Sequence, residues 1–301
     1  MLTFKAIELE DKDIIESYLK HQNYRVSDLS FTNLFAWSNK YNTKYATTDD
    51  WLFIRFLDNN GRSSYLMPVG TGDLKEAIEL IIEDHQQFDN VFQLRGLTEE
   101  MIEKIEAVLP DTFDYSLNRS VSDYVYTSEK LIHLRGKKLQ SKRNHINRFK
   151  RENEWKYVSL TGKTTEVIEC KRMLQEWMEE NGEEKDPSIV FEQEAIKLML
   201  HNFEELGLKG GFICVDGDVA AFTLGKELSE DTFVVHVEKA FTDIHGAYTI
   251  VNQQFVEHDL SEYKYINREE DMGLESLRKA KLSYQPDIIL KKHVARFKED
   301  K

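Results

Sequence analysis

Three short segments rich in β-branched and other apolar residues follow one another closely in the second half of the chain, at 211–215, 219–227 and 232–240. Asp216-Gly217-Asp218 joins the first two, a pattern typical of a tight hairpin because Gly and Asp accept a positive φ. Hydrophobic periodicity predicts the other elements of this half: a strand at 155–160, helices at 164–181 and 192–206, a helix at 247–258, a strand at 263–267, a helix at 273–282 and a strand at 288–294. The order β-α-α-β-β-β-α-β-α-β predicts an α/β (α+β) domain in which helices flank a mixed, twisted sheet.

The first half has a compatible but weaker order of elements. It contains an apolar helical stretch at 29–37, two strand-like runs on either side of the turn Asp58-Asn59-Asn60-Gly61, and two amphipathic helices, the second of them with Thr98 as its expected N-cap. A length of 301 residues fits two domains. We therefore expect an N-terminal domain at 1–128, a basic linker or helix at 129–152, and a C-terminal domain at 153–301 that carries the active site.

Composition limits the class of protein. The formal net charge is −14, which argues against general coating of nucleic acid but leaves room for one local basic site. The first residues show no basic region followed by an apolar run, and no apolar stretch approaches the ~20 residues that span a bilayer. The two cysteines, Cys170 and Cys214, have no metal-like spacing and are expected to be reduced thiols. These features predict a cytoplasmic protein without a metal site.

The segment 130–151 has the opposite charge to the rest of the chain. It holds nine Lys or Arg and no acid. Such a concentration of charge is a candidate binding site for the phosphate groups of a nucleotide, a tRNA or a lipid head group. The alternative is a solvated basic helix between two domains. The candidate phosphate ligands are Lys137, Lys138, Lys142, Arg143 and Arg148.

Several motifs resemble those of one known family. The stretches are DYVYTSEKLIHLRGKKLQSKRNHINRFKR, HVEKAFTDIHGAY, INREEDMGLESLRKAKLSYQP and, near the N-terminus, SFTNLFAW. They are similar to the C-terminal domain of phosphatidylglycerol lysyltransferases, over roughly residues 25–290. Related Fem-type transferases move amino acids from aminoacyl-tRNA onto peptidoglycan precursors. The resemblance implies two tandem GNAT-like acyltransferase domains and an aminoacyl or acyl transferase activity.

In the GNAT fold the sheet splays between its fourth and fifth strands, and the donor lies in the splay. In this chain the resemblance puts the splay between 232–240 and 263–267, beside His236 and Glu238. These two side chains share one face of a regular strand, and one of them is a candidate base; the alternative is the solvent-facing half of an amphipathic strand. Tyr284 is the candidate proton donor to the leaving group.

The junction after the strand 263–267 is a candidate substrate site, because polar groups gather where a strand becomes a helix. Glu269 and Glu270 are candidates to bind a cationic amino group, and Asp271 is either a third such ligand or the N-cap of the next helix. We expect substrate contacts from Asn267, Glu269, Glu270 and Asp271.

Two further groups of residues are candidates for binding the donor. The turn 243–248 stands where acetyltransferases have their pyrophosphate loop, but only Gly246 fits that pattern, since Asp243 repels phosphate and Tyr248 crowds the backbone. This departure disfavours coenzyme A and favours a donor anchored elsewhere, for instance by 130–151. Arg278, Lys279 and Lys281 can meet the donor's phosphates or ribose; the alternative is a favourable charge at a helix C-terminus.

The sequence leaves three functions open. The leading one is transfer of an aminoacyl group from aminoacyl-tRNA to an amine or hydroxyl of a small-molecule or peptide acceptor, with tRNA bound through 130–151 and peripheral contact with a membrane allowed. The second is an acyl-CoA-dependent N-acyltransferase, and the third is a non-catalytic ligand-binding module on the same fold. No tightly bound cofactor is expected.

Overall fold

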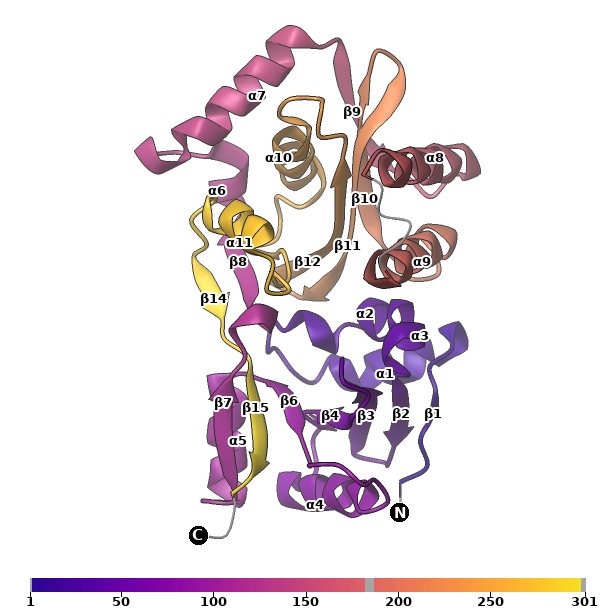
Figure 1. The fold of residues 1–301 in the computed structure, drawn as a ribbon, viewed down its shortest axis with the longest axis vertical. Coiled ribbons are helices and arrows are strands. Elements are labelled where there is room, and N and C mark those ends of the chain that lie inside the picture. The colour runs from indigo at the N-terminus through magenta and orange to yellow at the C-terminus, as the bar shows by residue number, and fades with distance from the viewer. Residues whose placement is uncertain (1, 182–186, 299–301) are drawn as a thin grey trace. The chain divides into compact units, whose positions relative to one another are not determined.

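The chain folds into two compact units, each built on its own mixed sheet with flanking helices (Figure 1). The computed structural model describes residues 2–181 and 187–298. The first unit runs up to Asp123 and takes back the chain from Leu290 onward, and the second comprises Tyr124–Ile289. The expected mixed α/β class is therefore confirmed.

The first unit contains an eight-stranded sheet. Its strand order is β1-β2-β3-β4-β6-β15-β7, and β5 pairs with β3. The strands are β1 (Lys5–Ala6), β2 (Lys44–Thr47), β3 (Trp51–Leu57), β4 (Ser63–Leu66), β5 (Val69–Gly70), β6 (Leu94–Leu97), β7 (Phe113–Leu117) and β15 (His293–Phe297). The helices are α1 (Lys12–Leu19), α2 (Phe31–Ala36), α3 (Ser38–Tyr41), α4 (Leu74–His85) and α5 (Glu99–Val108). Thr98 caps α5 as expected, because its side chain accepts a hydrogen bond from the Met101 amide.

The second unit contains a seven-stranded sheet in the order β14-β8-β13-β12-β11-β10-β9. Its strands are β8 (Asp123–Thr127), β9 (Trp155–Leu160), β10 (Lys209–Val215), β11 (Asp218–Ser229), β12 (Thr232–Ala240), β13 (Tyr265–Asn267) and β14 (Ile288–Leu290). Its helices are α6 (Ser128–His133), α7 (Gln140–Glu152), α8 (Thr164–Asn181), α9 (Pro187–His201), α10 (Ala247–Asp259) and α11 (Glu275–Leu282). Helix α10 covers one face of the sheet, and α8 and α9 cover the other (Figure 1).

The basic segment is part of the second unit rather than a linker between two domains. Its apolar residues Leu131, Leu139, Ile146 and Phe149 are buried in the same cluster as the inner face of α10. The thin apolar stripe of α7 is thus enough to anchor one edge of the helix, while its charged edge faces outward.

The end of the chain also differs from the expected arrangement. The predicted strand at 288–294 is two strands, of which β14 joins the second sheet and β15 pairs antiparallel with β6 and β7 in the first. An alternating apolar pattern shows that a segment is a strand but not which sheet it joins. The helix expected at 192–206 begins earlier, at Pro187, and ends at His201.

Among residues 2–181 and 187–298, no helix combines the length and the apolar character needed to cross a bilayer.

Candidate functional site

The site is built where β12 and β13 separate. The two strands pair in parallel only at Thr232–Tyr265, Phe233–Ile266 and Val234–Asn267, although β12 continues to Ala240. Beyond the last pair, side chains replace backbone hydrogen bonds. Arg268 donates to Glu238, with Nη2 and Nε at 2.7 and 2.8 Å from Oε2. The divergence that the resemblance implied is therefore present, and polar side chains line it.

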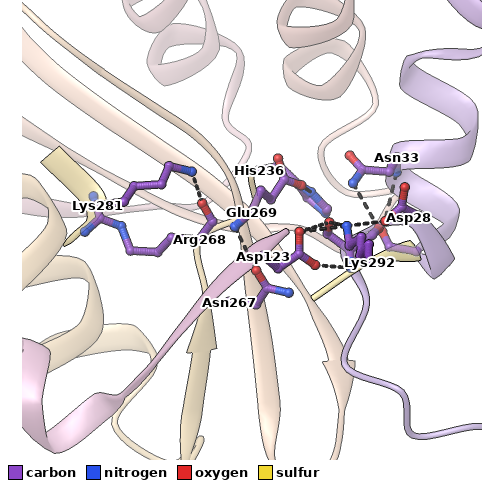
Figure 2. Close-up of polar contacts among 11 residues, drawn as sticks. Asp28, Asn33, Asp123, His236, Asn267, Arg268, Glu269, Lys281 and Lys292 are labelled. Atoms are coloured by element: carbon purple, nitrogen blue, oxygen red, sulfur yellow. Dashed lines mark hydrogen bonds and ion pairs between the residues drawn. The ribbon is translucent and has the colours of Figure 1, made fainter. Parts of the chain in front are cut away.

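A β-bulge in β12 decides how these side chains are presented. Leu224 of β11 stands opposite Val237 and Gly225 opposite Val235, so His236 is the extra residue of the bulge in the register of the two strands. The expectation that His236 and Glu238 share a face assumes an uninterrupted two-residue alternation, and a bulge interrupts the strand at this point. The two residues instead have different partners: Glu238 meets Arg268, and the buried imidazole of His236 lies with Nδ1 2.8 Å from Glu269 Oε1 (Figure 2).

The ion pair between Glu238 and Arg268 is largely buried but not saturated. The side chains are 14% and 11% exposed. The second carboxylate oxygen of Glu238, Oε1, and the second terminal nitrogen of Arg268, Nη1, are buried and have no hydrogen-bond partner in the described part of the chain. Thr223 stands opposite Glu238 on β11, and its hydroxyl is also buried and has no hydrogen-bond partner among the described residues. Buried polar atoms are normally satisfied, so an unmatched donor beside unmatched acceptors indicates a place for a polar ligand.

The loop after β13 has a strained backbone at two positions. Glu269 and Met272 both have positive φ, +56° and +51°. The side chain of Asn267 accepts a hydrogen bond from the Glu269 amide at 2.7 Å and so supports the first of these conformations (Figure 2). A left-handed conformation at a non-glycine residue costs energy, and such strain concentrates at functional loops. The loop thereby orients Glu269 towards His236.

Asp271 is a structural residue of this loop rather than an exposed ligand. It is fully buried and accepts hydrogen bonds from the Tyr124 hydroxyl, the Arg278 guanidinium and the Gly273 amide. Burial alone raises the pKa of Asp271, but these hydrogen bonds outweigh it and hold the pKa well below its usual range. Asp271 does not cap α11, whose N-cap is Leu274. Glu270 is half-buried in the same loop.

Tyr284 lies at the centre of the cluster, between two cations. Its buried ring has Arg268 Cζ at 4.7 Å and Lys142 Nζ at 4.1 Å from the centroid. Burial raises the pKa of the Tyr284 phenol, and the positive charge of Arg268 offsets this only in part. The phenol therefore holds its proton more firmly than a solvated tyrosine does, and its role as proton donor to the leaving group stays a prediction.

The predicted phosphate ligands of the basic segment are placed in different surroundings. Lys137 and Lys138 are exposed, whereas Lys142 is half-buried against Tyr284. Arg143 donates to the carbonyl oxygens of Leu134 and Gly136, and Arg148 pairs with Glu152 one turn along the helix. Arg143 and Arg148 are thus engaged within the segment, and Lys142 is the one of the five that reaches the cluster.

The turn 243–248 packs directly on the basic helix. Gly246 has φ +89°, and a Cβ at this position would come within 2.8 Å of the His145 carbonyl oxygen in α7. One residue earlier in the turn, His245 Nε2 lies 2.8 Å from His145 Nδ1. The structure therefore brings together the two segments that the sequence singled out separately for donor phosphates.

The three basic residues of α11 do not converge on one ligand. Arg278 binds Asp271, Lys279 is exposed and pairs with Glu275, and the ammonium of Lys281 donates to the Arg268 carbonyl oxygen (Figure 2). Successive residues of a helix point about 100° apart, so these neighbours face different surroundings. Lys281 is buried and supports the backbone of the residue that binds Glu238.

Arg268 and Thr223 are site residues that the sequence reasoning did not select. Arg268 directly follows a strand, and Thr223 interrupts an apolar one. An isolated polar residue in a fully buried strand was the available signal for Thr223. Nothing in the local sequence shows that Arg268 meets Glu238, because the contact joins residues 30 positions apart.

Known proteins resemble this chain in both sequence and fold. The model of the family "Phosphatidylglycerol lysyltransferase, C-terminal" matches residues 20–296. The crystal structure of a conserved protein of unknown function from Bacteroides thetaiotaomicron is 42% identical and has a TM-score of 0.92, with 99% of this chain and 100% of that chain covered. A curated relative, an uncharacterized protein of Mycoplasmoides gallisepticum, is 23% identical over 183 residues, and the match spans 60% of this chain and 58% of the relative.

More distant structures share the fold. L-PGS from Bacillus licheniformis is 14% identical with a TM-score of 0.68, and the match covers 97% of this chain and 93% of that chain. A tandem GNAT protein from the clavulanic acid biosynthesis pathway is 8% identical with a TM-score of 0.50, and each chain is covered completely. The two units described above therefore have the tandem GNAT-like architecture that the motifs implied.

Proposed function

The chain belongs to the phosphatidylglycerol lysyltransferase C-terminal family, and we propose that it moves an aminoacyl group from an aminoacyl-tRNA to an amine or hydroxyl acceptor. The observation that carries this proposal is the incompletely satisfied pair of Glu238 and Arg268 between the diverging strands. An aminoacyl ester has an ammonium group that a carboxylate binds and a carbonyl oxygen that a guanidinium binds. A simple acyl group has only the carbonyl.

The reaction requires few groups. The acceptor attacks the ester carbonyl carbon, the oxyanion that forms is stabilised by a donor, and the bond to the ribose oxygen then breaks. In this proposal Arg268 Nη1 faces the oxyanion and Glu238 Oε1 faces the α-ammonium group. The pair between Glu269 and His236 is a second polar contact at the same opening. The acceptor lies on the open side of the strand divergence.

The exposed lysines of the basic segment serve as the tRNA contact in this proposal. Lys137 and Lys138 have no carboxylate partner in the part of the chain that the structure describes, so their charges are available to phosphates. Each phosphate contact contributes about 0.7–0.9 to the slope of log affinity against log salt. The double variant Lys137→Gln/Lys138→Gln should therefore lower that slope by about 1.4–1.8 if both lysines contact phosphates.

The decisive experiment measures transfer of labelled lysine from lysyl-tRNA to phosphatidylglycerol vesicles and, in parallel, to ethanolamine as an amine acceptor. We expect transfer by the chain, and a loss of about 10²–10³-fold in kcat for Arg268→Lys, which keeps the charge but not the second guanidinium nitrogen. Affinity for lysyl-tRNA should change little in that variant, because in this proposal the exposed Lys137 and Lys138, and not the largely buried Arg268, contact the tRNA phosphates.

The matched control for the salt experiment is Lys163→Gln, an exposed lysine outside the basic segment. It should leave the salt slope unchanged. Titration with coenzyme A should give no heat. Absence of lysyl-tRNA binding at 50 mM salt, or coenzyme A binding with acyl transfer from acyl-CoA, would contradict the aminoacyl proposal.

A further inference from the structure

Lys142 differs from every other cation of the basic segment in its surroundings. It projects from the first turn of α7 and lies over the ring of Tyr284, 4.1 Å from the centroid, half-buried in the cluster that contains Arg268 and Glu238. Among the described residues it has no carboxylate within ion-pair distance. A phosphate-binding lysine is normally a solvated charge, whereas this amine is partly removed from water and placed beside another cation.

The other polar groups of the cluster are already engaged with one another. The carboxylate of Glu238 is held by the guanidinium of Arg268. Tyr284 keeps its proton because it is buried. The ring of His236 is fully buried and already bonded to Glu269. The amine of Lys142, in contrast, is half-exposed, so it contacts both the Tyr284 ring and the solvent.

We propose that Lys142 is the general base of the transfer, an inference that rests on the proposed function. As the acceptor nitrogen or oxygen forms its bond to the ester carbonyl carbon, its proton passes to Nζ of Lys142. When the tetrahedral intermediate collapses and the carbon–oxygen bond to the ribose breaks, the same proton passes from the Lys142 ammonium to the leaving 2′ or 3′ oxygen. Lys142 ends each cycle as the neutral amine, and no further reactant is needed.

The charges around Lys142 favour the neutral amine. Burial is the largest cause and the positive charge of Arg268 the second, and together they lower the pKa of Lys142 to about 8, against the weaker opposing effect of Glu238. Tyr284 faces the amine as a neutral phenol, and His145 lies one turn further along α7, hydrogen-bonded to His245. An amine of this pKa is half deprotonated near pH 8, and general base catalysis is most efficient when the pKa of the base lies near the operating pH.

The first test needs no substrate. Trace labelling of the chain with acetic anhydride over a pH series, read by peptide mass spectrometry, measures when each amine becomes nucleophilic. Lys163 is the matched exposed lysine. We expect half-maximal labelling of Lys142 near pH 8, below the value of about 10.4 for a lysine in a model peptide, and therefore a pH dependence different from that of Lys163. Labelling of the two lysines with the same pH dependence would overturn the inference.

The second test separates a base from a phosphate ligand. Arginine preserves the charge but does not deprotonate, so Lys142→Arg should lower kcat by about 10²–10⁴-fold while leaving the affinity for lysyl-tRNA within twofold. Lys142→Gln gives the same comparison without a bulky side chain, and Lys163→Arg controls for the substitution. The kcat of the unaltered chain should rise with pH and level off above about pH 8.

The outcomes are distinct. Retention of kcat by Lys142→Arg, or loss of tRNA affinity in both variants at unchanged kcat, identifies Lys142 as a charge that binds phosphate and overturns the base role. Loss of kcat in His236→Gln with retention in Lys142→Arg assigns the base to His236 instead. Absence of transfer by the unaltered chain overturns the proposed function, and the base role with it, whatever the labelling shows.

Discussion

Arg268 and Glu238 form an ion pair, 2.7 Å between Nη2 and Oε2, just beyond the last backbone pair of β12 and β13. The contact links the two strands where they have separated, as backbone hydrogen bonds link them where they are paired. It also holds a positive and a negative group side by side at an opening in the sheet. The same two residues therefore link the strands and, in the proposed function, contact the reacting group.

Removing one member of this pair should be costly. Glu238→Met or Arg268→Met alone leaves a largely buried charge without its partner, and we expect a loss of about 3–5 kcal/mol in the free energy of unfolding. The double variant should recover most of this loss, because two apolar side chains of similar size can pack together. Urea denaturation of the three variants gives the coupling energy. The control is Glu152→Gln, which removes an exposed pair with Arg148 and should cost less than about 0.5 kcal/mol.

The turn that carries Gly246 should be intolerant of a side chain. Gly246→Ala combines an unfavourable φ of +89° with a Cβ only 2.8 Å from the His145 carbonyl oxygen. Gly217→Ala is the matched control, because that glycine has φ +100° and nothing within 4 Å of a Cβ. We expect about 1–2 kcal/mol of destabilisation for the control and about 1–3 kcal/mol more at position 246, measured by thermal unfolding. Equal losses would show that α7 and the turn move apart freely.

In the first unit, Lys292 should be essential for stability. Its ammonium lies 2.7 Å from Asp123 Oδ1 and also contacts Asp28, and the Lys292 and Asp123 side chains are fully buried (Figure 2). Lys292→Met leaves these carboxylates without the cation, and we expect a loss of about 3–5 kcal/mol. The neighbouring Lys291→Met should have almost no effect, because its pair with Glu99 is at 3.5 Å and exposed. Similar melting temperatures for the two variants would refute this prediction.

The pair between His145 and His245 should make stability depend on pH. Burial, followed by the nearby His245, Lys142 and Arg148, lowers the pKa of His145 in the folded chain. The unfolded chain therefore binds more protons below its own histidine pKa of about 6.5, and stability should fall as the pH drops through that value. His145→Gln should flatten this dependence, whereas His201→Gln, at an exposed position, should not. Urea midpoints at pH 7.5 and 5.5 measure the difference, and identical slopes for the unaltered chain and His145→Gln would disprove it.

Local patterns were sufficient for most of the elements. The hairpin at Asp216-Gly217, the cap at Thr98, and the strand 232–240 all depend on neighbours in the sequence, and each was predictable for that reason. The same holds for Glu238 as a candidate catalytic residue and for Lys142 as a candidate phosphate ligand, since an acidic residue in an apolar strand and a lysine in a cationic segment can be recognised from the sequence alone. The sequence motifs indicated the family, and the family implied the tandem fold.

Tertiary structure decided which of these residues meet. The bulge at His236, the ion pair that holds Glu238, and the separate surroundings of Lys142, Arg143 and Arg148 all depend on contacts between segments distant in the chain. The assignment of β15 to the first sheet is of the same kind. A periodic pattern determines which face of an element is buried, but strand register and charge burial are set by partners that the pattern does not name, and the chemistry of this site lies in those partners.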